Sequence, residues 1–180
     1  MTDDIKKRLD VVLVAGGKYH DIDFARLELL KLLAEDDRIR TRVYEDYSNL
    51  HAISNADFLI TYTCDVRPTL EQQKVLRDFV ANGKRWLALH GTNSILQFLS
   101  DGRVDCPRVA PIFMETLGSQ FLSHPPIEPY TVTVADGDHH LVEGVEPFET
   151  NDELYLMETH GELHVLLETE FEGNTPGFVE

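Results

Sequence analysis

The chain contains little cysteine. Its 180 residues include only Cys64 and Cys106, and no C-x-x-C motif. Two isolated thiols exclude a small fold held together by disulfides and favour the reduced side chains of a cytoplasmic protein. Long hydrophobic runs are also missing. The run from Val11 to Ala15, which follows a polar start, is too short for a signal peptide core or a membrane span. We therefore expect a soluble, cytoplasmic protein.

Positive charge is scarce in the sequence. It has 16 lysines and arginines against 32 aspartates and glutamates, which gives a net charge of −16. An acidic surface repels phosphate backbones and anionic lipids, so we expect neither nucleic acid nor a membrane as a partner. The length, with 42% hydrophobic residues, suits one folded domain over residues 1–180.

Familiar nucleotide and zinc-protease motifs are missing. Gly16 and Gly17 follow the first apolar run, but neither G-x-G-x-x-G nor G-K-[ST] occurs there, which argues against a nucleotide site. No H-E-x-x-H motif occurs among the eight histidines. His51 lies in a polar stretch and is predicted to be on the surface. His164 lies in an apolar strand pattern, which favours a structural role.

Apolar runs alternate with amphipathic stretches in the first half of the chain. The pattern predicts strands at 9–15, 42–44, 57–63 and 85–89, and helices at 24–36 and 69–81. We expect the glycine pair at 16–17 to end the first strand, and Asp21 or Asp23 to cap the first helix. The buried stripe of that helix is predicted to be Phe24, Leu27, Leu30 and Ala34.

The alternation of strands and helices indicates a parallel sheet with helices on both faces. The second half differs, because its apolar residues alternate with polar ones, as in antiparallel strands. Such strands are predicted at 130–135, 153–157 and 163–169. The expected fold is a three-layer α/β domain with an irregular, partly antiparallel C-terminal part.

Polar side chains follow three of the predicted parallel strands, in the segments 16–21, 64–68 and 90–94. Because the carboxyl ends of parallel strands meet at one sheet edge, where ligands bind in open α/β sheets, we expect a shared pocket there. The same residue types also suit ordinary turns, so both interpretations stay open. Histidines near such turns suit acid–base chemistry or metal binding; they are His20, His90, His124 and His139.

A nucleophile is harder to find. The segment 85–94 has the form of a strand that turns sharply into a helix, as in a nucleophile elbow. The reactive position of such an elbow carries serine or cysteine, and here the candidates are Leu89 and His90. Cys64 ends another strand, but no adjacent base identifies it as reactive.

Six segments together resemble one known family. They read GGKYHDIDFARLELLKLL, DFLITYTCDVRP, GKRWLALHGTNS, ETLGSQFLSHPP, DHHLVEG and NDELYLMETHGELHVLL. In this order they are similar to the ThuA-like (trehalose utilisation) family, from about residue 10 to the end of the chain. The resemblance implies the class I glutamine amidotransferase-like fold, with a flavodoxin-like sheet. Family members usually continue past the final G-F-V-E, so the chain is expected to lack C-terminal strands of this domain.

The resemblance also implies a set of polar site positions. The elbow cysteine of true amidotransferases falls on Leu89, and a leucine cannot form a thioester, so no glutaminase activity is expected. The family usually has D-H-P where this chain has Asp138-His139-His140, which loosens the turn around His139. The ThuA-like family is associated with the catabolism of trehalose, related glycosides or oxidised sugars. The implied positions are His20, His90, His124, Asp138, His139, Glu153 and Tyr155.

The first hypothesis is an enzyme that acts on a small sugar derivative through a histidine and carboxylate pocket. Its predicted catalytic residues are His90, His20, His124 and Glu153. Its predicted substrate-binding residues are Tyr19, Asp65, Arg67, Asn93, His139 and Tyr155. Three imidazoles and a carboxylate also suit a divalent metal such as zinc, manganese or nickel.

Two other hypotheses remain open. The missing nucleophile favours a non-catalytic sugar-binding or regulatory module that kept the fold. A glyoxalase- or protease-like enzyme that uses Cys64 is the third. The expected partners are a small sugar ligand and a second copy of the chain in a homodimer.

Overall fold

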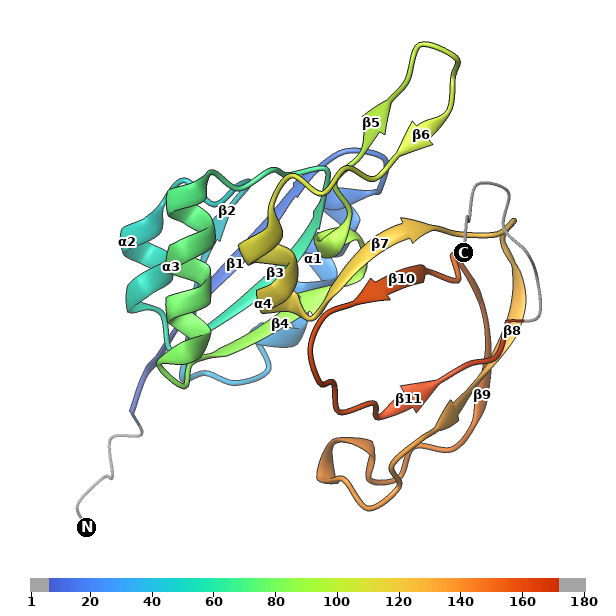
Figure 1. Ribbon diagram of the computed structural model, residues 1–180. Coiled ribbons are helices and arrows are strands. Elements are labelled where there is room, and N and C mark those ends of the chain that lie inside the picture. The colour runs from blue at the N-terminus through green and yellow to red at the C-terminus, as the bar shows by residue number, and fades with distance from the viewer. Residues whose placement is uncertain (1–6, 172–180) are drawn as a thin grey trace.

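The computed structural model describes residues 7–171, and its centre is a parallel sheet (Figure 1). The four strands pair in the order β2-β1-β3-β4, all parallel. They are β1 (Leu9–Gly17), β2 (Ile39–Tyr44), β3 (Phe58–Cys64) and β4 (Arg85–Leu89). The predicted parallel α/β sheet is therefore confirmed.

Helices cover both faces of this sheet, as predicted (Figure 1). One face packs against α1 (Ile22–Leu33), and the other against α2 (Leu50–Asn55), α3 (Leu70–Ala81) and α4 (Pro111–Leu117). Asp21 caps α1 by accepting a hydrogen bond from the Phe24 amide. Thr69 and Gln72 form a capping box at the start of α3. The sequence pattern missed the two shorter helices, α2 and α4.

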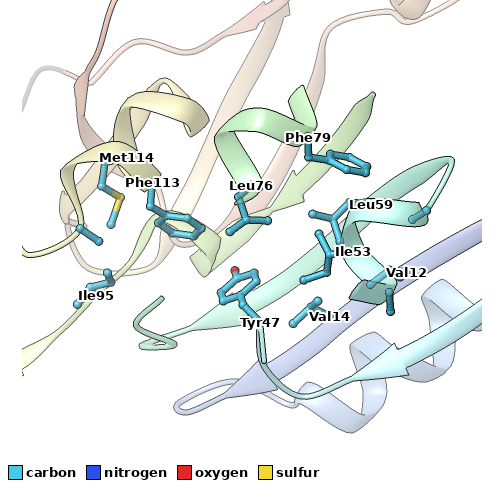
Figure 2. Packing of buried hydrophobic residues seen from close by; sticks show 13 residues of the cluster. Val12, Val14, Tyr47, Ile53, Leu59, Leu76, Phe79, Ile95, Phe113 and Met114 are labelled. Carbon is cyan, nitrogen blue, oxygen red and sulfur yellow. The ribbon is translucent and has the colours of Figure 1, made fainter. Parts of the chain in front are cut away.

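The alternation of side chains along β1 explains the two cores. Val11, Leu13 and Ala15 face α1, whereas Val12 and Val14 face the other helices. All five are at most 2% exposed, so the strand is buried on both faces, as its continuous apolar run predicts. Figure 2 shows the larger core, in which labelled side chains from the sheet and from α2, α3 and α4 pack around Leu76 and Phe113.

Smaller antiparallel sheets make up the second half. The hairpin of β5 (Gln97–Phe98) and β6 (Val104–Asp105) projects from the carboxyl edge of the parallel sheet (Figure 1). β7 (Ser119–Ser123) pairs with β10 (Leu156–Thr159), and β8 (Glu128–Val134) lies between β9 (Phe148–Asp152) and β11 (Leu167–Glu168). Residues 7–171 also contain two 3-10 turns, η1 (His90–Asn93) directly after β4 and η2 (His140–Val142) between β8 and β9. The predicted strands 153–157 and 163–169 are thus shifted and shortened.

Two local predictions differ from the structure. The first strand runs through Gly16 and ends at Gly17, two residues beyond the predicted range 9–15, and the glycines lie close to the neighbouring backbone. A Cβ on Gly16 would lie 2.0 Å from the Glu45 carbonyl oxygen, and Gly17 has a φ of +108°. His164 lies outside any strand, with an exposed ring that contacts the Asp136 carboxylate at 2.6 Å.

The predicted stripe of α1 is correct only at Leu30, and the predicted burial of β4 is wrong. Phe24 and Leu27 are exposed, and α1 instead packs its Ile22, Leu29, Leu30 and Leu33 face on the sheet. β4 is an edge strand whose Leu87 side chain is half exposed, since within residues 7–171 only β3 pairs with it. No helix in this part of the chain is long and apolar enough to cross a membrane.

Candidate functional site

The loops that follow β1, β3 and β4 meet at the carboxyl edge of the sheet. His20 follows β1 and His90 begins η1 after β4, and their ring centroids are 4.4 Å apart. Tyr62 near the end of β3 stacks on His90 with ring centroids 5.7 Å apart. The topology therefore places polar side chains of separate strand ends together, as the sequence predicts.

Each of these three loops contains a non-glycine residue with a left-handed backbone. The φ angles are +71° at Tyr19, +55° at Asp65 and +48° at His90. Such conformations are unfavourable for most side chains and persist where surrounding contacts hold them, which is frequent at functional sites. Their presence in all three loops supports a functional role for this edge.

The Asp65 side chain makes the contacts that hold the three loops together. Its buried carboxylate accepts hydrogen bonds from the Lys18 ammonium at 3.0 Å and the Leu96 amide at 3.1 Å. Arg67 lies 3.5 Å from the same carboxylate and donates to the Leu96 carbonyl. Burial alone raises the pKa of the Asp65 carboxyl, but Lys18 and the Leu96 amide together hold that pKa below its usual value. Both residues position loops, and substrate binding by them stays a prediction.

The second half of the chain supplies a carboxylate to the site. Glu153 follows β9, and its carboxylate oxygens lie 3.5 Å from His90 Nε2 and 3.6 Å from His124 Nε2. The Tyr155 hydroxyl lies 3.3 Å from the same His90 nitrogen, and its ring stacks on the imidazole. One partly buried cluster thus unites His20, His90, His124, Glu153 and Tyr155.

Burial sets the protonation of two members of this cluster. It lowers the pKa of His20, and the adjacent His90 lowers it further, so the His20 imidazole is neutral at pH 7. Burial and the charge of Glu153 raise the pKa of the Tyr155 phenol, which therefore keeps its proton. The site contains a neutral imidazole, a carboxylate and a phenol that can donate a hydrogen bond.

The same cluster has the donors of a divalent metal site. Ligand atoms of His20, His90 and Glu153 all lie within 4.8 Å of one another. A tetrahedral zinc with bonds of roughly 2.0–2.1 Å separates its ligands by about 3.4 Å, close to the 3.5 Å between His90 and Glu153. Imidazole and carboxylate groups also suit manganese and nickel. These three residues fit a divalent cation.

Two cavities flank the cluster. One, which we name the aromatic cavity, has a volume of about 330 Å³ and is lined by Tyr19, Leu96, Phe98, Val104, Phe121 and Leu122, among others. The other, the acidic cavity, measures about 430 Å³ and includes Asp21, Phe24, Tyr62, Ile127 and Asp152. His20 and Glu153 line both cavities. Both volumes fall in the range of small-molecule sites.

The remaining predicted residues have different surroundings. Asn93 is buried, and its amide nitrogen donates to the Ser119 hydroxyl at 2.9 Å. His139 lines neither cavity and instead contacts the rings of His140 and His164. Cys64 is buried, and burial raises the pKa of its thiol to about 11, which does not favour a reactive thiolate.

Sequence reasoning missed the aromatic and acidic walls of the site. Tyr62 is the penultimate residue of the predicted strand 57–63, and Phe121 lies within β7. An aromatic residue within a strand is ordinarily expected in the core, so neither position indicated a site. Asp152 directly precedes the predicted Glu153, and only this proximity could have indicated it. Phe98 lies on a two-residue strand too short for any pattern.

Comparison with known proteins gives one family and several similar folds. A family model described as trehalose utilisation, ThuA, matches residues 10–178. A solved ThuA-like protein from Bacteroides uniformis ATCC 8492 has a TM-score of 0.71 at 17% identity, over 91% of this chain and 69% of that one. One from Parabacteroides merdae ATCC 43184 has a TM-score of 0.62 at 17% identity, over 91% and 68%. At this identity the two structures show the fold. A search of curated proteins found no match.

We predict that Asp65→Asn destabilises the protein in a pH-dependent way. Asparagine keeps the shape and tolerates the positive φ, but it removes the negative charge that strengthens the hydrogen bonds from Lys18 and the Leu96 amide. At pH 7 the free energy of unfolding should fall by about 1–3 kcal/mol. Because the folded-state pKa of Asp65 is lowered, its stabilisation is complete above the unfolded pKa and disappears as the pH falls through the folded pKa.

Urea unfolding of the wild type and of this variant at several pH values measures that difference. It should be largest near pH 7 and shrink below about pH 4. Asp101→Asn is the matched control, since Asp101 pairs with Arg103 on an exposed turn and should change little. Equal stability of Asp65→Asn and the wild type at pH 7 would contradict the positioning role.

Proposed function

The chain belongs to the trehalose utilisation (ThuA) family, and from this premise we propose that it transforms a small sugar derivative at the cluster around Glu153. The family match supports a role in the use of trehalose or related glycosides. The reaction class that the geometry supports best is proton transfer to and from the sugar. Neither the sugar substrate nor the proton transfer requires a thiol nucleophile. This agrees with Leu89 at the position where an elbow would carry its cysteine.

One observation carries the proposal: a carboxylate lies between two imidazoles at the junction of two cavities. General acid–base catalysis needs one group that removes a proton and another that returns one, both within reach of the substrate. Glu153 or the neutral His20 can accept a proton from a sugar hydroxyl or from a carbon next to a carbonyl. A protonated His90 or His124 can then donate one to an oxygen of the sugar.

A divalent cation at the same cluster is the second form of this proposal. The specific observation that favours it is the convergence of ligand atoms from His20, His90 and Glu153. A bound cation would act as a Lewis acid that polarises a sugar carbonyl or hydroxyl. His124 and Tyr155 would then be the groups left to exchange protons with the substrate.

We expect Glu153→Gln to abolish most turnover of a responsive sugar. The assay screens trehalose, other disaccharides and keto-sugars, first by thermal shift and then by product analysis. The amide keeps the size of the side chain but cannot accept a proton, so kcat/KM should fall by about 10²- to 10⁴-fold. Glu149→Gln is the matched control, because Glu149 is an exposed glutamate on β9. Ligands that stabilise the wild type and are recovered unchanged would instead support the non-catalytic sugar-binding module.

The metal form makes a separate prediction. Protein purified without a histidine tag should bind one Zn²⁺, Mn²⁺ or Ni²⁺ per chain in isothermal titration calorimetry. His20→Ala should weaken that affinity by at least about 10-fold, because it removes one of the three ligands. His51→Ala on the exposed surface of α2 should leave it unchanged. A metal-free protein without affinity for any of these ions would rule out the metal form and leave the acid–base form.

A further inference from the structure

The two cavities differ sharply in chemistry although they share His20 and Glu153. Carboxylates of Asp21, Asp152 and Glu153 line the acidic cavity, so sugar hydroxyls would find acceptors there. The Asp152 Oδ1 atom accepts a hydrogen bond from the Glu153 amide at 2.8 Å, and the other carboxylate oxygen can accept one from a ligand. The ring of Phe24 is mostly exposed at the same cavity and offers a surface for the apolar face of a sugar ring.

The aromatic cavity presents mainly apolar side chains, and several are uncovered. Tyr19, Phe98 and Val104 are 56%, 58% and 50% exposed. Phe98 pairs with Val104 across the β5–β6 hairpin, and its ring centroid lies 5.7 Å from that of Tyr19. The hairpin projects beyond the sheet (Figure 1). Its residues Phe98 and Val104 line the aromatic cavity together with Tyr19. Contiguous exposed apolar side chains beside a cavity are typical of a ligand contact.

Few hydrogen-bonding groups reach the aromatic cavity apart from the shared cluster. The Ser123 hydroxyl is buried and without a hydrogen-bond partner in the part of the chain that the structure describes, and the buried Ser94 hydroxyl lies beside the Tyr155 phenol. A second sugar ring carries several hydroxyls, and burying them without partners is costly. A flat apolar group with one or two polar atoms fits this cavity better, because it covers the aromatic side chains and meets the two serines.

We propose that the site takes a glycoside in two parts, with its sugar in the acidic cavity and an apolar, aromatic aglycone in the aromatic cavity. This inference rests on the proposed function, since it names the substrate class of the same site. The bond between the two parts then lies beside His20 and Glu153, the residues that line both cavities. Phe98 is the specificity-determining residue for the aglycone.

Calorimetric titration with matched glycosides tests this arrangement. The probes are phenyl and methyl D-glucopyranosides, each as both anomers, together with trehalose. The phenyl glycoside of one anomer should bind at least about 10-fold more tightly than its methyl counterpart, because only the phenyl ring covers the aromatic cavity. Phe98→Ala should reduce this preference below about 3-fold without changing the affinity for the methyl glycoside.

Phe148→Ala is the matched control, because Phe148 is an exposed phenylalanine on β9 outside both cavities, and it should keep the full preference. Val104→Ser gives a second change on the opposite strand of the hairpin and should also weaken phenyl binding. Equal affinities for phenyl and methyl glycosides, tighter binding of trehalose than of the phenyl glycoside, or no binding of any probe would overturn the inference.

The outcomes separate this inference from the proposed reaction. A phenyl preference that depends on Phe98, in a protein that converts no sugar, would remove the reaction and leave the two-part pocket. Turnover that depends on Glu153, without any phenyl preference, would keep the reaction and remove the aromatic subsite.

Discussion

The site depends on the contact between the Glu153 carboxylate and the imidazoles of His90 and His124. His90 begins η1 directly after strand β4 of the parallel sheet, whereas Glu153 and His124 belong to the second half of the chain. Pairing of β7 with β10 supports this contact, because His124 directly follows β7 and Glu153 shortly precedes β10. Asn93 adds a link by donating to Ser119 on β7 and to the sulfur of Met157 on β10. The antiparallel part therefore contributes side chains to the candidate site.

In the first half of the chain, loops with strained backbone conformations position the side chains of the candidate site. The left-handed backbone of His90 turns its ring toward His20 and Tyr155, where an amidotransferase of this fold would have its elbow. The packing of Gly91 against the end of β3 leaves no room for a Cβ, which would lie 2.9 Å from the Thr63 carbonyl oxygen. This turn carries Leu89 where the resemblance to amidotransferases would place a reactive cysteine, and in our proposal the reacting groups are those around Glu153 instead.

Local signals in the sequence predicted the features that depend on local physics. The apolar run of β1, the Asp21 cap and the Thr69 cap all follow from residues close in sequence. The meeting of three loops followed from topology alone. The orientation of α1 could not be predicted, because Phe24 and Leu29 are equally apolar and only packing on the sheet decides which is buried. The neighbours of His139 could not be predicted either, since a resemblance gives the residue type but not the rings of His140 and His164 beside it.

Nuclear magnetic resonance of the histidine rings tests the central claim that these residues form one site. The spectra of the wild type and of Glu153→Gln would be compared with ring-labelled histidine, assigned by single substitutions. Signals of His20, His90 and His124 should all move, because the carboxylate charge beside them is removed. Signals of His51, His139 and His164 should stay in place. Unchanged spectra for His90 and His124, or equal changes in all the histidines, would contradict the account.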